Sequence, residues 1–130
     1  MRIEELKEMV LTIRKDMKAV KIPCGAIENI KIARKNARYF AITEMQNNGK
    51  YTITFSGVAL LAGKKSLINT IMHELCHTCR GAYNHGAKFK KYGDMVYKNF
   101  GYKIETHSTE EEDKAVEIYK DWMKDILFRI

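Results

Sequence analysis

The segment from His73 to His77 constrains this chain more than any other, because it places two histidines four residues apart inside a helical hydrophobic pattern. Between residues 66 and 79 the apolar side chains recur at spacings of three and four, at Leu67, Ile68, Ile71, Met72 and Leu75. Residues four apart lie one turn above each other on the same helix face. The pattern therefore predicts a helix that buries one face and directs both imidazoles toward one point.

Glu74 completes the pattern H-E-x-x-H, which supplies two metal ligands and a general base within one helical turn. Its side chain leans to one side of the point that His73 and His77 share, so it is placed to activate a water and not to bind the metal. The alternative is an ordinary core helix whose two histidines are satisfied by hydrogen bonds. The site hypothesis needs a third ligand from outside the turn.

His85, in the stretch "NHGAKF", is the expected third ligand. Gly81 lets the chain leave the helix, and Gly86 allows a close backbone approach as the next helix starts. Three histidines leave a fourth zinc position open for water or a substrate carbonyl, which is typical of catalytic and not of structural zinc sites. The remaining histidine, His107, lies next to an expected helix cap and is expected at the surface.

The three cysteines, Cys24, Cys76 and Cys79, are too few for a four-cysteine zinc ribbon and odd in number for a disulfide framework. On one continuous helix, Cys79 would lie about 240° around from His73, at 100° per residue. A closed site of two cysteines and two histidines is therefore not expected. We expect packed, reduced thiols, and a cytoplasmic protein.

The rest of the chain alternates between helix and strand patterns. Residues 3–20 carry an apolar stripe at helical spacing, 87–100 form a helix that ends at Gly101, and 107–130 form a capped final helix. Residues 28–58 change to strand patterns around a hairpin turn at Asn48-Gly49. The predicted fold class is α+β: an N-terminal helix, a small antiparallel sheet, the histidine helix and two further helices, in a single domain over 1–130.

Charge is unevenly distributed along the chain. Of a net charge of +7, residues 106–130 hold 7 acidic and 4 basic residues, which leaves 9 acidic and 19 basic residues in the first 105. A body this basic is expected to attract polyanions, nucleic acid first. The alternative is a solvated basic surface that only keeps the protein soluble. The sequence contains no apolar run of the length that a membrane span needs, so no membrane partner is expected. The basic residues that flank the histidine motif are Arg34, Lys35, Arg38, Lys64, Lys65, Lys88, Lys90 and Lys91.

With "HELCHTC" followed by "NHGAKFKKYG", the sequence resembles the SprT-like metallopeptidase family, whose pattern is H-E-x-x-H followed by a histidine in H-G-x-x-F. His73, Glu74, His77 and His85 match the four functional positions, and Gly86 and Phe89 complete the second motif. The first motif is shared by many zinc peptidases, but the pair together is fairly specific. The similarity extends over about residues 28–103.

This resemblance implies a zincin-type fold, a bound Zn²⁺ and hydrolysis of peptide bonds in a protein or peptide substrate. Zinc ligands would be His73, His77 and His85, and Glu74 would be the catalytic base. Eukaryotic relatives cleave proteins crosslinked to DNA, so DNA is an expected partner through the basic body. The strand Lys50–Ser56 is a candidate edge for an extended substrate. The alternative function is a basic nucleic-acid-binding module with a structural metal site.

Overall fold

The computed structural model describes residues 1–33 and 40–104. The elements follow the predicted α+β order, with one short additional helix, α2, between the sheet and the histidine helix. They are α1 (Ile3–Ala19), β1 (Ile27–Ile32), β2 (Ala41–Met45), β3 (Tyr51–Phe55), α2 (Gly57–Leu61), α3 (Lys64–His77) and α4 (Ala87–Phe100). The predicted final helix, His107 and the basic residues Arg34, Lys35 and Arg38 lie outside the described residues.

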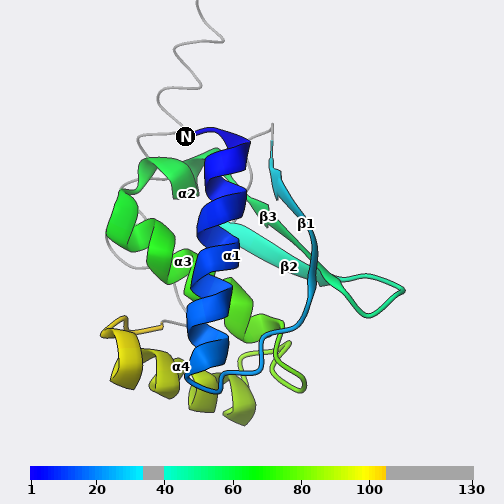
Figure 1. Cartoon of the computed structure of the whole chain (residues 1–130), viewed down its shortest axis with the longest axis vertical. Helices are drawn as coiled ribbons and strands as arrows, with labels where there is room; N and C mark the ends of the chain where they lie inside the picture. The colour runs from blue at the N-terminus through cyan, green and yellow to red at the C-terminus, as the bar shows by residue number, and fades with distance from the viewer. Residues whose placement is uncertain (34–39, 105–130) are drawn as a thin grey trace, which may run out of the picture.

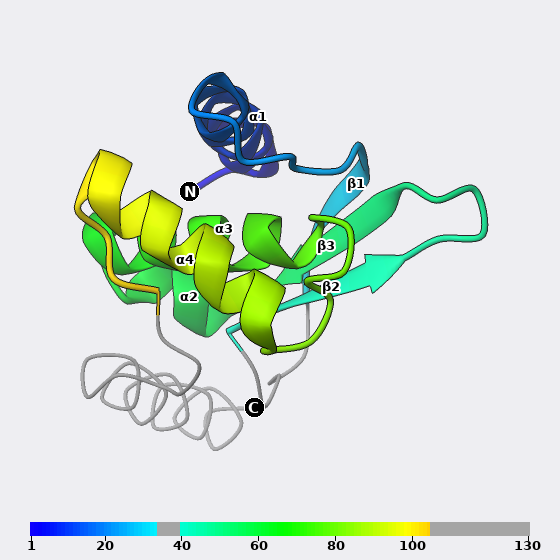
Figure 2. The ribbon, with the colours of Figure 1, turned by 90° about the horizontal axis from the view of Figure 1, so that it is seen from below.

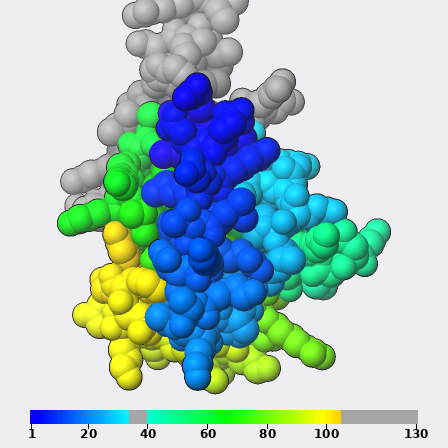
Figure 3. Space-filling view, viewed as in Figure 1, coloured from blue at the N-terminus to red at the C-terminus, as the bar shows by residue number. Residues whose placement is uncertain are grey.

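Helix α1 buries the predicted apolar stripe against the rest of the domain. Leu6, Val10, Ile13 and Met17 are buried at spacings of three and four, while the intervening positions are mostly charged. The helix packs on α3 and β1 and covers the middle of one face of the molecule (Figure 3). Burial of this apolar stripe therefore holds α1 against both β1 and the histidine helix α3.

The sheet has the strand order β1-β3-β2 and is mixed, which corrects the prediction of an antiparallel sheet. β2 and β3 form the predicted antiparallel hairpin, which projects away from the helices (Figure 2). β1, however, pairs parallel to β3. The alternation of apolar residues predicts a strand and its buried face, but it does not determine which neighbour the strand pairs with.

The same strand order corrects the proposed substrate edge. β3, within the predicted edge segment Lys50–Ser56, is the central strand, and both of its sides are occupied by β1 and β2. β1 and β2 are the two outer strands, and within the part of the chain that the structure describes no strand pairs with the outer side of β2. β2 also contacts α3, so the sheet edge lies beside the histidine helix.

Helix α3 is the most enclosed element, since it contacts α1, α2, β2 and α4. Eight of its residues are buried: Leu67, Thr70, Ile71, Met72, Glu74, Leu75, Cys76 and His77. α4 crosses beneath it (Figure 1) and ends, as predicted, at Gly101, which has a left-handed φ of 79° that glycine adopts without strain. Glu74 and His77, two of the three functional residues on α3, are thus embedded in the hydrophobic core and not on a solvated helix face.

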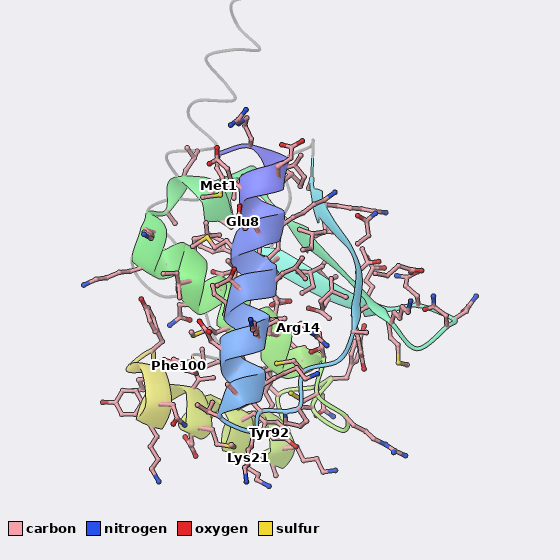
Figure 4. All side chains as sticks on the ribbon, viewed as in Figure 1. Met1, Glu8, Arg14, Lys21, Tyr92 and Phe100 are labelled. Atoms are coloured by element: carbon pink, nitrogen blue, oxygen red, sulfur yellow. The ribbon has the colours of Figure 1, made fainter. Side chains whose placement is uncertain are left out.

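The segment between α1 and β1 joins the first helix to the end of α3. Arg14 faces this segment (Figure 4), and its Nε donates a hydrogen bond to the Gly25 carbonyl at 2.8 Å. The Gly25 N–H donates to Thr78 Oγ1 at 2.9 Å. A Cβ at Gly25 would meet the Tyr51 ring at 2.6 Å and the Thr78 carbonyl oxygen at 2.8 Å, so the close approach requires glycine.

No helix in residues 1–33 and 40–104 is long and apolar enough to cross a membrane.

Replacing Thr78 by valine tests how much this junction stabilises the fold. The substitution keeps the side-chain shape but leaves the Gly25 N–H without its acceptor, so we expect the free energy of unfolding to fall by about 1–3 kcal/mol. Urea unfolding of the metal-free protein, followed by circular dichroism, measures the change. Thr78→Ser retains the hydroxyl and is the matched control; equal stability of the valine and serine variants would contradict the prediction.

Candidate metal centre

Three histidine side chains converge at the end of α3. His73 and His77 come from consecutive turns of the helix, and His85 comes from the loop that leads to α4. The Nε2 atom of His77 lies 3.2 Å from that of His73 and 3.1 Å from that of His85. The Nε2 atoms of His73 and His85 are 3.3 Å apart, so the three atoms form a nearly equilateral triangle. The structure thus brings together the three residues that the sequence singled out as ligands.

The size of this triangle fits a metal ion. Two nitrogen ligands at 2.0–2.1 Å from a tetrahedral zinc ion lie about 3.3 Å apart. The observed separations of 3.1–3.3 Å match that value without rearrangement. The three histidines can therefore hold a metal ion in their present positions.

The hydrogen bond of His77 favours the metal-binding form of its ring. Nδ1 lies 3.0 Å from the Ala82 carbonyl oxygen, an acceptor, so Nδ1 carries the proton and Nε2 presents a lone pair. Burial lowers the pKa of His77, and the neighbouring His85 lowers it further, against the backbone hydrogen bonds that raise it. Burial and the neighbouring His85 thus both favour the neutral imidazole, which metal binding requires.

Phe89 of α4 packs against all three imidazoles. Its ring centroid lies 4.9 Å from His73, 4.5 Å from His77 and 4.9 Å from His85. The Phe89 side chain is only 1% exposed and stacks on His77 with an interplanar angle of 29°. The phenylalanine of H-G-x-x-F is therefore the apolar support of the histidine cluster, and it restricts the orientation of each ring.

Glu74 lies beside the cluster with its carboxyl group in the protein interior. The residue is 5% exposed, and burial raises the pKa of its carboxyl from an ordinary value of 4.5 to about 8. Thr43 of β2 donates its hydroxyl to Glu74 Oε1 at 3.0 Å, while Oε2 lies 3.8 Å from His73 Nε2. The two carboxyl oxygens thus have different roles: one is held by the sheet, and the other faces the histidines.

Thr43 is a site residue that the sequence reasoning missed. Its contact with Glu74 spans 31 positions in the chain, and no local pattern specifies it. The strand patterns predicted over residues 28–58 include Thr43, but they give no register that would show its side chain turned toward Glu74. Only the observed pairing of β2 with β3 fixes that register.

A cavity of about 380 Å³ opens over the histidines and Glu74. One wall is the edge strand, at Ala41–Thr43, and the opposite wall is the loop Tyr83–His85. Ile42 and Tyr83 are 40% and 57% exposed, so the rim of the cavity is apolar and accessible. The histidine cluster is therefore accessible from solvent between the edge strand and this loop.

The three cysteines are free and buried, as the packed-thiol prediction requires. Cys79 lies just beyond the end of α3, and its thiol is hydrogen-bonded to Cys24, which lowers the pKa of Cys24. Burial raises the pKa of Cys76 to about 12. None of the three belongs to the histidine cluster, so a mixed cysteine and histidine site is excluded for these residues.

The chain is thus an α+β domain with a candidate metal site. An enclosed helix carries H-E-x-x-H, and the loop that follows it brings a third histidine to the same point. The family model of the SprT-like family matches residues 8–110, and the chain belongs to that family. No curated protein and no solved structure is significantly similar to the chain.

Metal titration tests the cluster directly. We expect one Zn²⁺ ion per chain, and a loss of affinity of more than about 100-fold in His73→Ala, His77→Ala or His85→Ala, because loss of a ligand costs more than loss of a supporting contact. Competition with a chromophoric chelator measures the affinity. His107→Ala is the matched control and should bind like the wild type; unchanged affinity in any of the other three variants would remove that histidine from the site.

The buried carboxyl of Glu74 predicts a pH-dependent stability of the metal-free protein. The folded state keeps this proton up to about pH 8, whereas the unfolded state loses it near pH 4.5, so stability falls as pH rises through this window. Glu74→Gln removes the effect. We expect the variant to equal the wild type at pH 4.5 and to exceed it by about 2–4 kcal/mol at pH 8.

Urea unfolding in the presence of a chelator at both pH values measures this difference. Glu44→Gln, at an exposed position of the same edge strand, is the control for a change of net charge. A stability difference between Glu74→Gln and wild type that does not grow with pH would contradict the assignment of the buried charge to Glu74.

Proposed function

We propose that this protein is a zinc-dependent metallopeptidase that hydrolyses peptide bonds. The observation that carries the proposal is the convergence of three Nε2 atoms at 3.1–3.3 Å beside the Glu74 carboxyl, in a cavity lined by a sheet edge. Membership of the SprT-like family supports it. Within the described residues the cluster has three histidines, which favours a site with an open coordination position over a closed structural one.

The proposed reaction divides between the histidines and Glu74. His73, His77 and His85 would hold zinc, which supplies Lewis acidity that makes water more acidic and polarises a carbonyl oxygen. Glu74 Oε2 accepts the proton of the attacking water and then delivers it to the leaving amine. A nearby cation stabilises the ionised carboxylate, so the high pKa of Glu74 applies to the metal-free protein and is lower in the loaded one.

The edge strand β2 is the proposed binding site for an extended substrate. The N–H of Gln46 donates to the Lys50 carbonyl, and the N–H of Ser56 donates to the Phe40 carbonyl. Because hydrogen-bonded pairs alternate along an antiparallel ladder, Ala41, Thr43 and Met45 direct their backbone groups away from β3. A substrate strand paired with them would lie along the cavity and gain affinity independent of its sequence.

Proteins associated with DNA are the proposed substrates, with DNA bound through the basic surface. Lys64 and Lys65 begin α3, and Lys88, Lys90 and Lys91 lie in the first turns of α4; all five are exposed. The first two lysines lie on the helix that carries His73 and His77. The other three lie on the helix whose Phe89 packs against the histidine cluster. Contacts between these lysines and phosphates would make binding strongly dependent on salt.

The proposal is tested by incubating the zinc-loaded protein with histone H1 and with casein, with and without single-stranded DNA. We expect cleavage by the wild type, stimulation of histone cleavage by DNA that weakens as salt is raised, and a loss of more than about 100-fold in Glu74→Gln. Gel electrophoresis and mass spectrometry identify the products. Glu8→Gln, at an exposed position of α1 that does not line the cavity, is the matched control and should cleave like the wild type.

The same variants separate the peptidase from a nucleic-acid-binding module with a structural metal. In a peptidase, Glu74→Gln retains zinc and any DNA binding but loses cleavage. In a binding module, Glu74→Gln has no functional effect, whereas His77→Ala destabilises the fold. Absence of cleavage by a protein that holds one zinc ion per chain would contradict the proposed activity, and DNA affinity that does not change with salt would contradict the proposed partner.

A further inference from the structure

We propose that Thr43 is the positioning residue of the catalytic base: its hydroxyl holds Glu74 Oε1 so that Glu74 Oε2 faces the histidine cluster. The inference rests on the proposed peptidase function for its kinetic consequence, but the contact itself is independent of that function. It assigns a role to a residue of the edge strand that lies outside both histidine motifs.

The hydroxyl of Thr43 is placed to form a hydrogen bond with Glu74. It lies 3.0 Å from Glu74 Oε1 and 3.3 Å from the Glu74 backbone oxygen, and both of these atoms are acceptors. A threonine hydroxyl has one proton, and the shorter distance favours donation to Oε1. At 5% exposed, Thr43 is as buried as Glu74, and the hydrogen bond is shielded from competing water.

This bond selects one orientation of a carboxyl group that would otherwise rotate. With Oε1 fixed by Thr43, the second oxygen is left 3.8 Å from His73 Nε2, on the side of the metal cluster. Without this bond, no hydrogen bond to the sheet would hold the carboxyl group in the orientation that turns one oxygen toward the histidines. Misplacement of a reacting group by about 1 Å costs about 100-fold in rate, so a single hydrogen bond is sufficient to matter.

Thr43 also couples the base to the substrate. Its backbone N–H and carbonyl point to the outer edge of β2, and its side chain points to Glu74. A substrate strand paired at Thr43 is therefore held by the same residue that orients the base. Thr43 therefore sets the distance between the scissile bond of the substrate and Glu74. This distance does not depend on how two separate elements are placed relative to each other.

The test compares Thr43→Val, which keeps the shape and loses the hydroxyl, with Thr43→Ser, which keeps the hydroxyl. Thr52→Val is the matched control, because Thr52 is also buried, lies on the neighbouring strand β3 and does not line the cavity. Thr43→Ala replaces Thr43→Val if the valine variant does not fold. Steady-state kinetics use zinc-loaded protein and a quenched-fluorescent peptide based on a cleavage site mapped in casein.

We expect kcat to fall about 10- to 100-fold in Thr43→Val with KM within about threefold of the wild type, and Thr43→Ser to recover most of the loss. Zinc affinity should be unchanged in all variants, because no metal ligand is altered. A kcat within about threefold of the wild type in Thr43→Val, a loss confined to KM, or a serine variant as impaired as the valine variant would overturn the assignment.

A second readout does not depend on activity. The side-chain carboxyl ¹³C resonance of Glu74 in the metal-free protein is identified by its absence from Glu74→Gln. We expect Thr43→Val to move this resonance, and Thr43→Ser and Thr52→Val to leave it near its wild-type position. If the wild type cleaves nothing, the peptidase proposal fails while this measurement still decides the contact, and an unmoved resonance in Thr43→Val would refute the positioning role.

Discussion

The packing of Phe89 against three imidazoles is the contact on which the metal centre depends. Two of the histidines are fixed by the helix that carries them, but His85 lies in a loop and is exposed. Phe89 follows His85 by four residues, at the start of α4, and is buried against α3. Docking of α4 on α3 therefore brings His85 into position, and the hydrophobic effect that holds the two helices together also closes the triangle of ring nitrogens.

Burial of Glu74 lowers the stability of the fold. An ionised carboxylate in the core of this α+β domain is unfavourable, and one threonine hydroxyl offsets only part of this cost. The structure accepts a destabilising group where the proposed chemistry needs it, beside the histidines and beneath the edge strand. The buried Cys76 on the same helix carries no comparable cost, because a neutral thiol packs as a small apolar group.

The sequence predicted those parts of the site that depend on local spacing. Helix geometry indicated the convergence of His73 and His77, with Glu74 beside them. The short loop that follows, with Gly81 and Gly86, made His85 the expected third ligand. The α+β element order was predicted for the same reason. The parallel pairing of β1 with β3 and the contact between Thr43 and Glu74 were not, because strand order and register depend on contacts between segments distant in the chain.

The difference in chain separation has a consequence for how the site is assembled. The three histidines span only 12 positions, whereas the partner of Glu74 lies 31 positions away across the sheet. Contacts between segments close in the chain cost less loop-closure entropy than contacts between distant segments. The histidine cluster is therefore a local feature of the α3–α4 segment, whereas the orientation of Glu74 also requires the sheet to dock on α3.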